Sequence, residues 1–105
     1  MLLVWSPTFY VNRDRVAELQ LESGLPTVSA FATENGALMS YGSDPFEPWR
    51  RAAYYVDRLL RGAKPSELPV EQVSKFKLTI NLKTAKALKV ALPESILMRA
   101  DEVIR

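Results

Sequence analysis

The chain has 105 residues, 48% apolar and 25% charged, which is the balance of a folded globular protein with room for one domain and one core. Lys and Arg number 14 against 12 Asp and Glu, a surplus too small to indicate a nucleic-acid partner or an anionic membrane surface. Neither Cys nor His occurs, which excludes a disulfide framework, a zinc ribbon and a thiol nucleophile. We therefore expect no metal and no cofactor.

The amino terminus is apolar but has no basic leader, and its apolar run is too short for the core of a secretory signal. No stretch approaches the roughly 20 apolar residues that a membrane-spanning helix needs. As written, the chain is expected to stay in the cytoplasm.

The first third of the chain predicts a strand, a helix and a second strand. Residues 2–5 form a short apolar run typical of a strand buried on both faces, and residues 8–11 are interpreted as the loop beyond it. Asn12 is the predicted N-cap of a helix that ends at residues 24–26, and residues 27–29 form the next strand. Strands joined in this way are parallel. Residues 32–35 are predicted to make one helical turn.

Residues 38–60 carry the strongest pattern in the sequence. A strand over residues 37–41 is predicted to turn at Gly42 into a long helix, whose apolar residues recur at helical spacing: Trp49, Ala52, Ala53, Val56, Leu59 and Leu60. Asp44 and Glu47 have the spacing of a capping box, and Pro48 favours a helix that begins near Glu47. Such a junction is a common ligand site in α/β proteins and equally the ordinary connection from a strand to a helix.

After this helix, residues 63–73 are interpreted as an extended connection. Residues 76–83 alternate apolar and polar, which predicts a strand with one buried face. A short helix that begins at Asn81 or Lys83 and runs through Leu88 follows, and a last helix is predicted from residue 92 to Ile104. Together the elements predict an α/β fold with a mostly parallel sheet flanked by helices, in a single domain over residues 1–105.

No catalytic constellation is present, and we expect the protein not to be an enzyme. Ser6, Ser40 and Ser43 have no histidine to activate them and are interpreted as turn or cap residues. A small hydrolase built on Ser and Asp would lack a base, and no glycine-rich phosphate loop occurs. Tyr10 and Tyr41 stand out, because both are predicted in loops beyond strand ends, where α/β sheets hold ligands.

Several segments, taken in order, resemble the C-terminal part of the bacterial ABC transporter substrate-binding proteins with the type I periplasmic-binding fold. The resemblance rests on residues 36–42, 50–53, 55–58, 61–65, 68–72, 75–76, 80–88 (INLKTAKAL) and 99–104. It implies a two-lobed receptor, periplasmic or lipid-anchored outside the cytoplasm. Such a receptor closes on a small-molecule ligand, an amino acid or related solute, and delivers it to an ABC permease.

The resemblance also implies a set of ligand-side residues, namely Ser6, Pro7, Tyr41, Gly42 and Asp44, to which Tyr10 is added because of its predicted loop position. The helix that follows Asp44 would favour an anionic group such as a carboxylate at its amino end, unless the Asp44 side chain already occupies those amides.

The chain also departs from the family pattern. Family members carry an export signal, a whole first lobe and the opening strands of the second lobe ahead of Met1, so we expect a C-terminal fragment of a two-lobed receptor. A glycine is usual where this chain has Lys89. Residues 49–60 and 2–4 would lack their neighbours, which predicts a homo-oligomer. The alternative to a binding module is a truncated remnant that acts only as an oligomeric structural or interaction domain.

Overall fold

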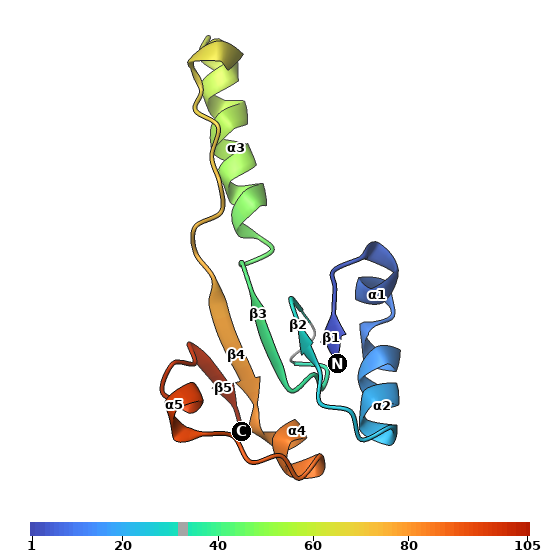
Figure 1. Cartoon of the computed structure of the whole chain (residues 1–105). Coiled ribbons are helices and arrows are strands. Elements are labelled where there is room, and N and C mark those ends of the chain that lie inside the picture. Colours follow the sequence, from blue (N-terminus) through green and yellow to red (C-terminus); the bar gives the residue numbers. More distant parts are fainter. Residues whose placement is uncertain (32–33) are drawn as a thin grey trace. The chain divides into compact units, whose positions relative to one another are not determined.

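The computed structural model describes residues 1–31 and 34–105, and the chain divides into two compact units (Figure 1). Unit 1 comprises Met1–Gly42 and Lys77–Arg105, and unit 2 comprises Ser43–Phe76. The helical turn expected at 32–35 includes residues outside the described part of the chain.

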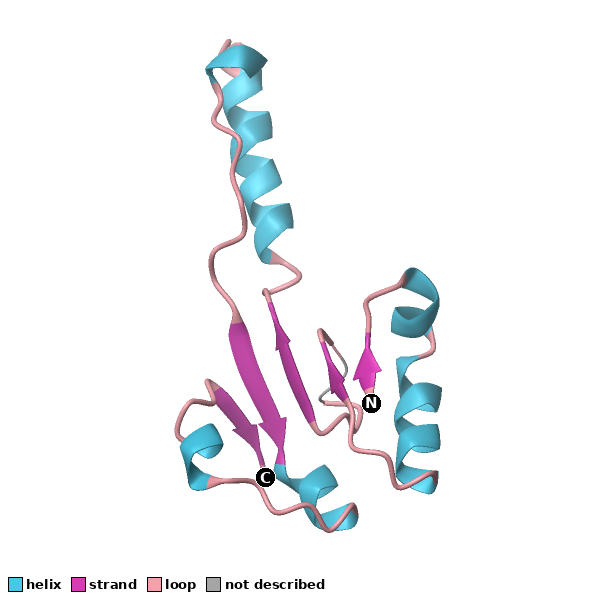
Figure 2. Cartoon of the chain, viewed as in Figure 1, coloured by secondary structure: helices cyan, strands magenta, loops and turns pink. Residues whose placement is uncertain are grey.

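Unit 1 contains a five-stranded sheet in the order β1–β2–β3–β4–β5 (Figure 2). The strands are β1 (Leu2–Leu3), β2 (Val28–Ser29), β3 (Met39–Gly42), β4 (Lys77–Asn81) and β5 (Glu102–Ile104). Only the β3–β4 pair is antiparallel, and the other three pairs within the described residues are parallel. The prediction of an α/β fold with a mostly parallel sheet is therefore confirmed.

The described helices of unit 1 are α1 (Pro7–Val11), α2 (Arg13–Glu22), α4 (Leu82–Ala87) and α5 (Glu94–Leu97). Two of these four helices, α1 and α4, begin at a side-chain cap, whereas Asn12 before α2 and Pro93 before α5 make no side-chain cap hydrogen bond. The Asn81 side chain accepts the N–H of Thr84 at 3.1 Å and so caps α4. The Ser6 hydroxyl accepts the N–H of Phe9, and Pro7 occupies the first position of α1. This cap explains why residues 8–11, interpreted from the sequence as a loop, form a helix instead.

Two further predictions were wrong. Residues 2–5 do not form a strand buried on both faces, because only Leu3 is buried while Leu2 and Val4 are 74% and 68% exposed. The last predicted helix ends at Leu97, and the chain then forms β5 beside β4. Asp101 holds this strand in place, since its carboxylate accepts the Leu78 N–H at 2.7 Å and its own N–H donates to the Leu78 carbonyl at 2.8 Å.

The core of unit 1 is small and lies near the amino end of β3. Its buried apolar residues are Leu3, Ala17, Ala37, Leu38, Ile80 and Ala85. The carbonyl of Gly36 accepts hydrogen bonds from both the Gln20 amide of α2 and the Thr84 hydroxyl of α4. Gly36 has a φ of 121°, and a Cβ there would lie 3.3 Å from the Ala17 Cβ. Only glycine therefore fits this junction without strain.

Unit 2 consists of α3 (Glu47–Leu60), a short 3₁₀ helix η1 (Pro65–Glu67) and an extended segment over residues 68–76. The expected start near Glu47 is confirmed, but the capping box is wrong. The Asp44 carboxylate accepts the N–H of Phe46 at 2.8 Å, because the chain makes a tight turn before the helix instead of a reciprocal cap.

Candidate functional site

The carboxyl ends of β1, β2 and β3 lie along one edge of the sheet, because the three strands are parallel (Figure 1). From this edge the chain enters α1 after β1, passes through Ala30 and Phe31 after β2, and ends β3 at Gly42. Five of the six sequence-predicted site residues lie in these segments: Ser6, Pro7, Tyr10, Tyr41 and Gly42. We refer to this region as the carboxyl edge.

Ser6 and Pro7 shape the backbone of the carboxyl edge. The Ser6 hydroxyl accepts the Phe9 N–H at 3.2 Å, and the Ser6 carbonyl accepts the N–H of Tyr10 at 3.0 Å. Both residues therefore turn the chain sharply from β1 into α1. This turn is what places the Tyr10 ring at the same edge as the end of β2.

Tyr10 lies in α1 and not in a loop, which corrects the sequence prediction. Its ring contacts Phe31 edge-to-face, with 5.8 Å between the ring centroids and an angle of 69° between the planes. The Arg13 guanidinium lies over the Tyr10 ring, 4.9 Å from its centroid, and donates to the Tyr10 carbonyl at 3.0 Å. Sequence reasoning missed Phe31, although an aromatic residue directly after a parallel strand is a usable signal.

Tyr41 and Gly42 also differ from the loop prediction, because β3 continues through both of them by pairing with β4. Tyr41 is opposite Leu78 in the antiparallel ladder, and its side chain is 60% exposed. Gly42 meets the end of β2, since a Cβ at this position would lie 3.0 Å from the Ala30 carbonyl oxygen. Glycine is therefore required here by close backbone approach.

Asp44, the sixth predicted site residue, belongs to unit 2. One carboxylate oxygen accepts the Phe46 N–H, and the other lies 3.4 Å from the Arg50 guanidinium. The side chain thus already satisfies one backbone amide before α3. The sequence predicted an anionic ligand at the amino end of α3 unless the Asp44 side chain already occupied the backbone amides there. Because Asp44 does accept one of these amides, the prediction is weakened.

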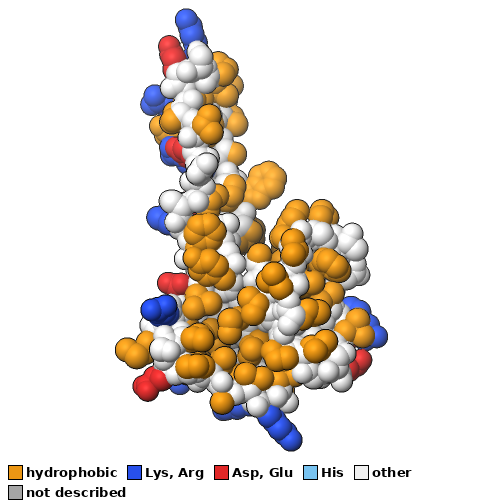
Figure 3. Space-filling view, viewed as in Figure 1, with side chains coloured by type: hydrophobic (Ala, Val, Ile, Leu, Met, Phe, Trp, Pro, Cys, Tyr) orange, Lys and Arg blue, Asp and Glu red, His pale blue; other side chains and the backbone are white. Residues whose placement is uncertain are grey.

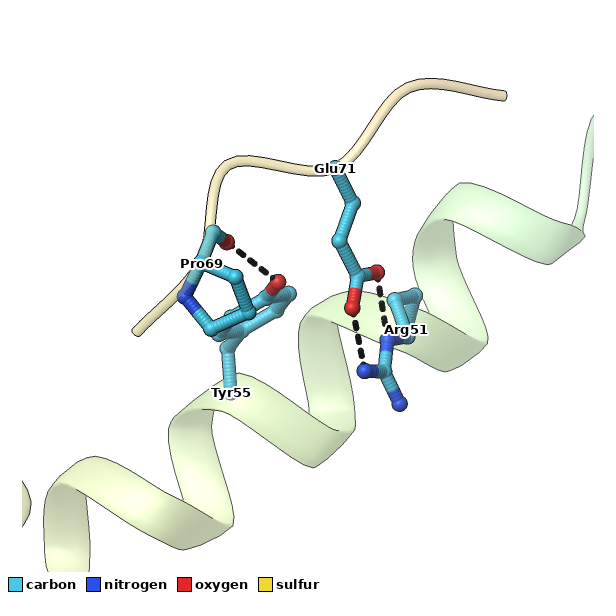
Figure 4. Close-up of polar contacts among 4 residues, drawn as sticks. All are labelled: Arg51, Tyr55, Pro69 and Glu71. Carbon is cyan, nitrogen blue, oxygen red and sulfur yellow. Dashed lines mark hydrogen bonds and ion pairs between the residues drawn. The ribbon is translucent and has the colours of Figure 1, made fainter. Parts of the chain in front are cut away.

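Unit 2 has a groove of its own, of about 800 Å³, between α3 and residues 69–75. Arg51 forms a two-pronged ion pair with Glu71, with 2.6 Å between Nε and the nearer carboxylate oxygen, and the Tyr55 hydroxyl donates to the Pro69 carbonyl at 2.7 Å (Figure 4). Sequence reasoning missed this cluster because Arg51 and Glu71 are 20 residues apart.

The charges of the groove perturb one another. The hydrogen bonds from Arg51 hold the pKa of the Glu71 carboxyl below its ordinary value, and the same contact raises the pKa of Arg51. Partial desolvation, and then the neighbouring Glu71 carboxylate, raise the pKa of the Tyr55 hydroxyl. Because these groups satisfy each other, the cluster fastens residues 69–71 to α3, and the charges of Arg51 and Glu71 are already paired.

The chemistry at the carboxyl edge is that of recognition. It presents aromatic faces and a guanidinium that stacks on one of them, with no activated nucleophile and base among its described residues. Within the described residues, no group of three or more acidic side chains could hold a metal ion. No helix in that part of the chain is long and apolar enough to cross a membrane.

Comparison with known proteins agrees with this geometry. The family model of ABC transporter substrate-binding proteins matches residues 25–104. No curated protein sequence matches the chain significantly.

Two solved structures share the fold closely. A conserved domain protein from Vibrio cholerae O1 biovar El Tor is 26% identical with a TM-score of 0.90, over 97% of this chain and 35% of that one. An ABC domain in complex with L-Trp from Streptococcus pneumoniae is 30% identical with a TM-score of 0.83, over 94% of this chain and 35% of that one.

A third structure shows the fold alone. It is the ligand-free, open form of a substrate-binding protein with adhesive properties from Clostridium difficile, at 19% identity and a TM-score of 0.63 over 98% of this chain and 35% of that one. The chain thus spans about a third of the length of the solved structures it matches.

Proposed function

The chain belongs to the family of ABC transporter substrate-binding proteins, and we propose that its carboxyl edge forms part of the binding site for an amino acid or a related small solute. Proteins of this family bind solutes and are not enzymes, in agreement with the expectation from the sequence. The site residues proposed on unit 1 are Ser6, Pro7, Tyr10, Tyr41 and Gly42, together with Phe31. Asp44 remains a ligand-side candidate from unit 2.

The observation that carries the proposal is the gathering of aromatic side chains at the carboxyl ends of three parallel strands. Tyr10 and Phe31 form an edge-to-face pair, and the exposed Tyr41 lies one residue before the end of the neighbouring strand β3. Aromatic faces of this kind bury planar, apolar ligand groups, and the Streptococcus pneumoniae structure was solved with L-Trp. An amino acid with an aromatic side chain is therefore the first ligand to test.

The remainder of the receptor is also part of the proposal. Because the chain spans 35% of the length of each matched structure, we infer that it corresponds to a C-terminal part of a two-lobed receptor. In such a receptor the ligand would be shared with a first lobe and delivered to an ABC permease, outside the cytoplasm. A half-site makes only part of the contacts, so binding by this chain alone is expected to be weak.

A second candidate is an oligomeric structural domain that holds no ligand. Extensive apolar exposure favours it, since Leu2, Val4 and Trp5 of unit 1 are each more than half exposed. Figure 3 shows hydrophobic side chains over much of the visible surface. The two candidates differ in one observable, because only a binding site is stabilised by a solute.

Thermal unfolding of the purified chain with L-Trp and with other amino acids tests the proposal. Ligand at about 100 times its dissociation constant should raise the free energy of unfolding by about 2.7 kcal/mol. Tyr41→Ala should remove that shift, whereas the matched variant Tyr54→Ala, on α3 outside the carboxyl edge, should retain it. If no amino acid shifts the transition at millimolar concentration, the oligomeric structural domain is the better account.

A further inference from the structure

Arg13 is a cation at the carboxyl edge that forms no ion pair with any described residue. It is the first residue of α2, just after α1 (Figure 1), and it is half-buried. Its guanidinium lies 4.9 Å from the centroid of the Tyr10 ring and donates a hydrogen bond to the Tyr10 carbonyl at 3.0 Å. Residues 32 and 33, outside the described part of the chain, have no carboxylate in their side chains. The chain therefore leaves the positive charge of Arg13 without an acidic partner.

Two other cations of unit 1 differ from Arg13 in this respect. Arg15 lies two residues further along α2, about 200° around the helix, and pairs with Glu18 at 3.0 Å. Lys77, the first residue of β4, pairs with Glu102 of β5 at 2.5 Å. Because these two charges are already neutralised, an anionic ligand gains less from them. Of these three cations, Arg13 is the one whose charge is open to a ligand.

Asp14, the acidic residue next to Arg13, has a different partner. Its carboxylate accepts a hydrogen bond from the side-chain amide of Asn35 at 2.5 Å, which joins α2 to the turn before β3. Consecutive side chains of a helix point about 100° apart, so Asp14 and Arg13 leave α2 in different directions. Asp14 thus holds the helix in place and does not neutralise Arg13.

The stacked guanidinium of Arg13 can still bind a carboxylate. Its N–H donors lie in its own plane, so contact with an aromatic face leaves them able to reach a further acceptor. Among the described residues, only the Tyr10 carbonyl accepts a hydrogen bond from this side chain. A carboxylate matches the remaining donors best, because its oxygens accept two parallel N–H groups at once. An aromatic amino acid offers both a ring for the aromatic faces and a carboxylate for this guanidinium.

We infer that Arg13 is a ligand-binding residue that receives the carboxylate of the solute. The inference rests on the function proposed above and narrows the ligand to a solute that carries both a carboxylate and an aromatic group. It also gives the anionic group a receptor other than the amino end of α3, where Asp44 already accepts the Phe46 amide. Ring and charge recognition then come from adjoining residues of α1 and α2.

Two ligands that differ only in the carboxylate test this inference. L-Tryptophan and L-tryptophanamide share the indole ring and the α-amino group, which is charged in both at about pH 6. Each is titrated into the full ¹⁵N-labelled chain, and amide chemical shifts give the dissociation constants. The wild type should bind L-tryptophan about 10–100-fold more tightly than the amide, as expected for charge-assisted hydrogen bonds.

Substitutions at Arg13 should change this ratio of dissociation constants. In Arg13→Met the two ligands should bind equally within about twofold, and Arg13→Lys should give an intermediate ratio, because it keeps the charge and loses the planar fork. If Arg13 only supported the Tyr10 ring, Arg13→Met would weaken both ligands alike and leave the ratio unchanged. The matched control is Arg15→Met, the same change at an exposed residue paired with Glu18, which should retain the wild-type ratio.

The possible failures are distinguishable. Equal affinity of the wild type for L-tryptophan and its amide would overturn the assignment of Arg13 and leave the aromatic site in place. A preference for L-tryptophan that persists in Arg13→Met would also overturn it, because the carboxylate would then be bound elsewhere. If neither ligand binds at about 10 mM, the proposed function fails for aromatic amino acids and the assignment of Arg13 fails with it.

Discussion

Each of the two units of this chain is stabilised internally by a different kind of interaction. Every described residue that is buried belongs to unit 1, where Ile80 is fully enclosed and Leu3 and Leu38 are nearly so. No described residue of Ser43–Phe76 is buried, and unit 2 relies on the Arg51–Glu71 ion pair and the Tyr55–Pro69 hydrogen bond. A sheet with a small core can support itself, whereas a single amphipathic helix depends on a surface supplied by something else.

The largest effect should come from the core of unit 1. Ile80→Ala removes a side chain with 0% exposure from β4, between Met39 of β3 and Val103 of β5, and leaves a cavity in the core. We expect the free energy of unfolding to fall by about 2–4 kcal/mol. Urea denaturation followed by far-UV circular dichroism measures this difference.

Leu60→Ala is the matched change in unit 2, since it also truncates a large aliphatic residue within a regular element. Leu60 is 83% exposed, so at low protein concentration the free energy of unfolding should change by no more than about 0.5 kcal/mol. A comparable loss at both sites would mean that Leu60 is covered in the folded chain, and the contrast between the units would be lost.

A smaller change in the free energy of unfolding than that of Ile80→Ala is expected at the carboxyl ends of α3 and α4, which have the same backbone arrangement. Helix α3 ends with Gly62 at φ 99° and α4 ends with Lys89 at φ 56°, each with the paired backbone hydrogen bonds of a Schellman motif. A residue with a side chain is strained in this conformation. Lys89→Gly should therefore raise the free energy of unfolding by about 1 kcal/mol, and Gly62→Ala should lower it by about 1 kcal/mol. Urea denaturation measures both free-energy changes, and a loss of stability in Lys89→Gly would contradict the prediction that Lys89 is strained.

Much of this architecture could be predicted from the sequence, because its signals are local. Three helix boundaries depend on neighbouring residues only: the cap of α4 at Asn81, one of the two starts expected for that helix, the end of α2 just before Gly24, and the start of α3 at Glu47. The last strand could not be predicted from periodicity, since Val103 and Ile104 fit a helical stripe as well as a strand. Their state is decided by hydrogen bonds between Asp101 and Leu78, which are distant in the chain.

The candidate site could be predicted only in part. The resemblance supplied the segments that follow β1 and β3, and parallel pairing brings those segments to one edge of the sheet. It did not supply Phe31, which becomes a candidate site residue only because the Tyr10 ring of α1 packs against it. Nor could it supply the partners of Arg51, because a contact across 20 residues leaves no mark in the local pattern.

The smallest effect concerns pH and is confined to unit 2. The pKa of Glu71 is lowered by its hydrogen bonds with Arg51, so the stabilisation is present above the ordinary carboxyl pKa and is lost as pH falls through the lower folded value. The pKa of the Tyr55 hydroxyl is raised, so its hydrogen bond to Pro69 is present below the ordinary phenol pKa and is lost as pH rises through the higher folded value. Residues 69–71 should thus be fastened to α3 across the neutral range.

Amide hydrogen exchange of residues 68–75 measures this fastening against pH, after correction for the intrinsic pH dependence of exchange. Protection in the wild type should fall as pH drops through the lowered pKa of Glu71, and Glu71→Gln should remove that acid step while it lowers protection at neutral pH. Tyr55→Phe should remove the alkaline step and leave the acid one. Amides of β4 at Thr79 and Ile80, buried in unit 1, serve as the internal reference, because no titrating contact of unit 2 holds them. Parallel loss of protection in both units would mean that the whole chain unfolds together and that unit 2 has no separate stability.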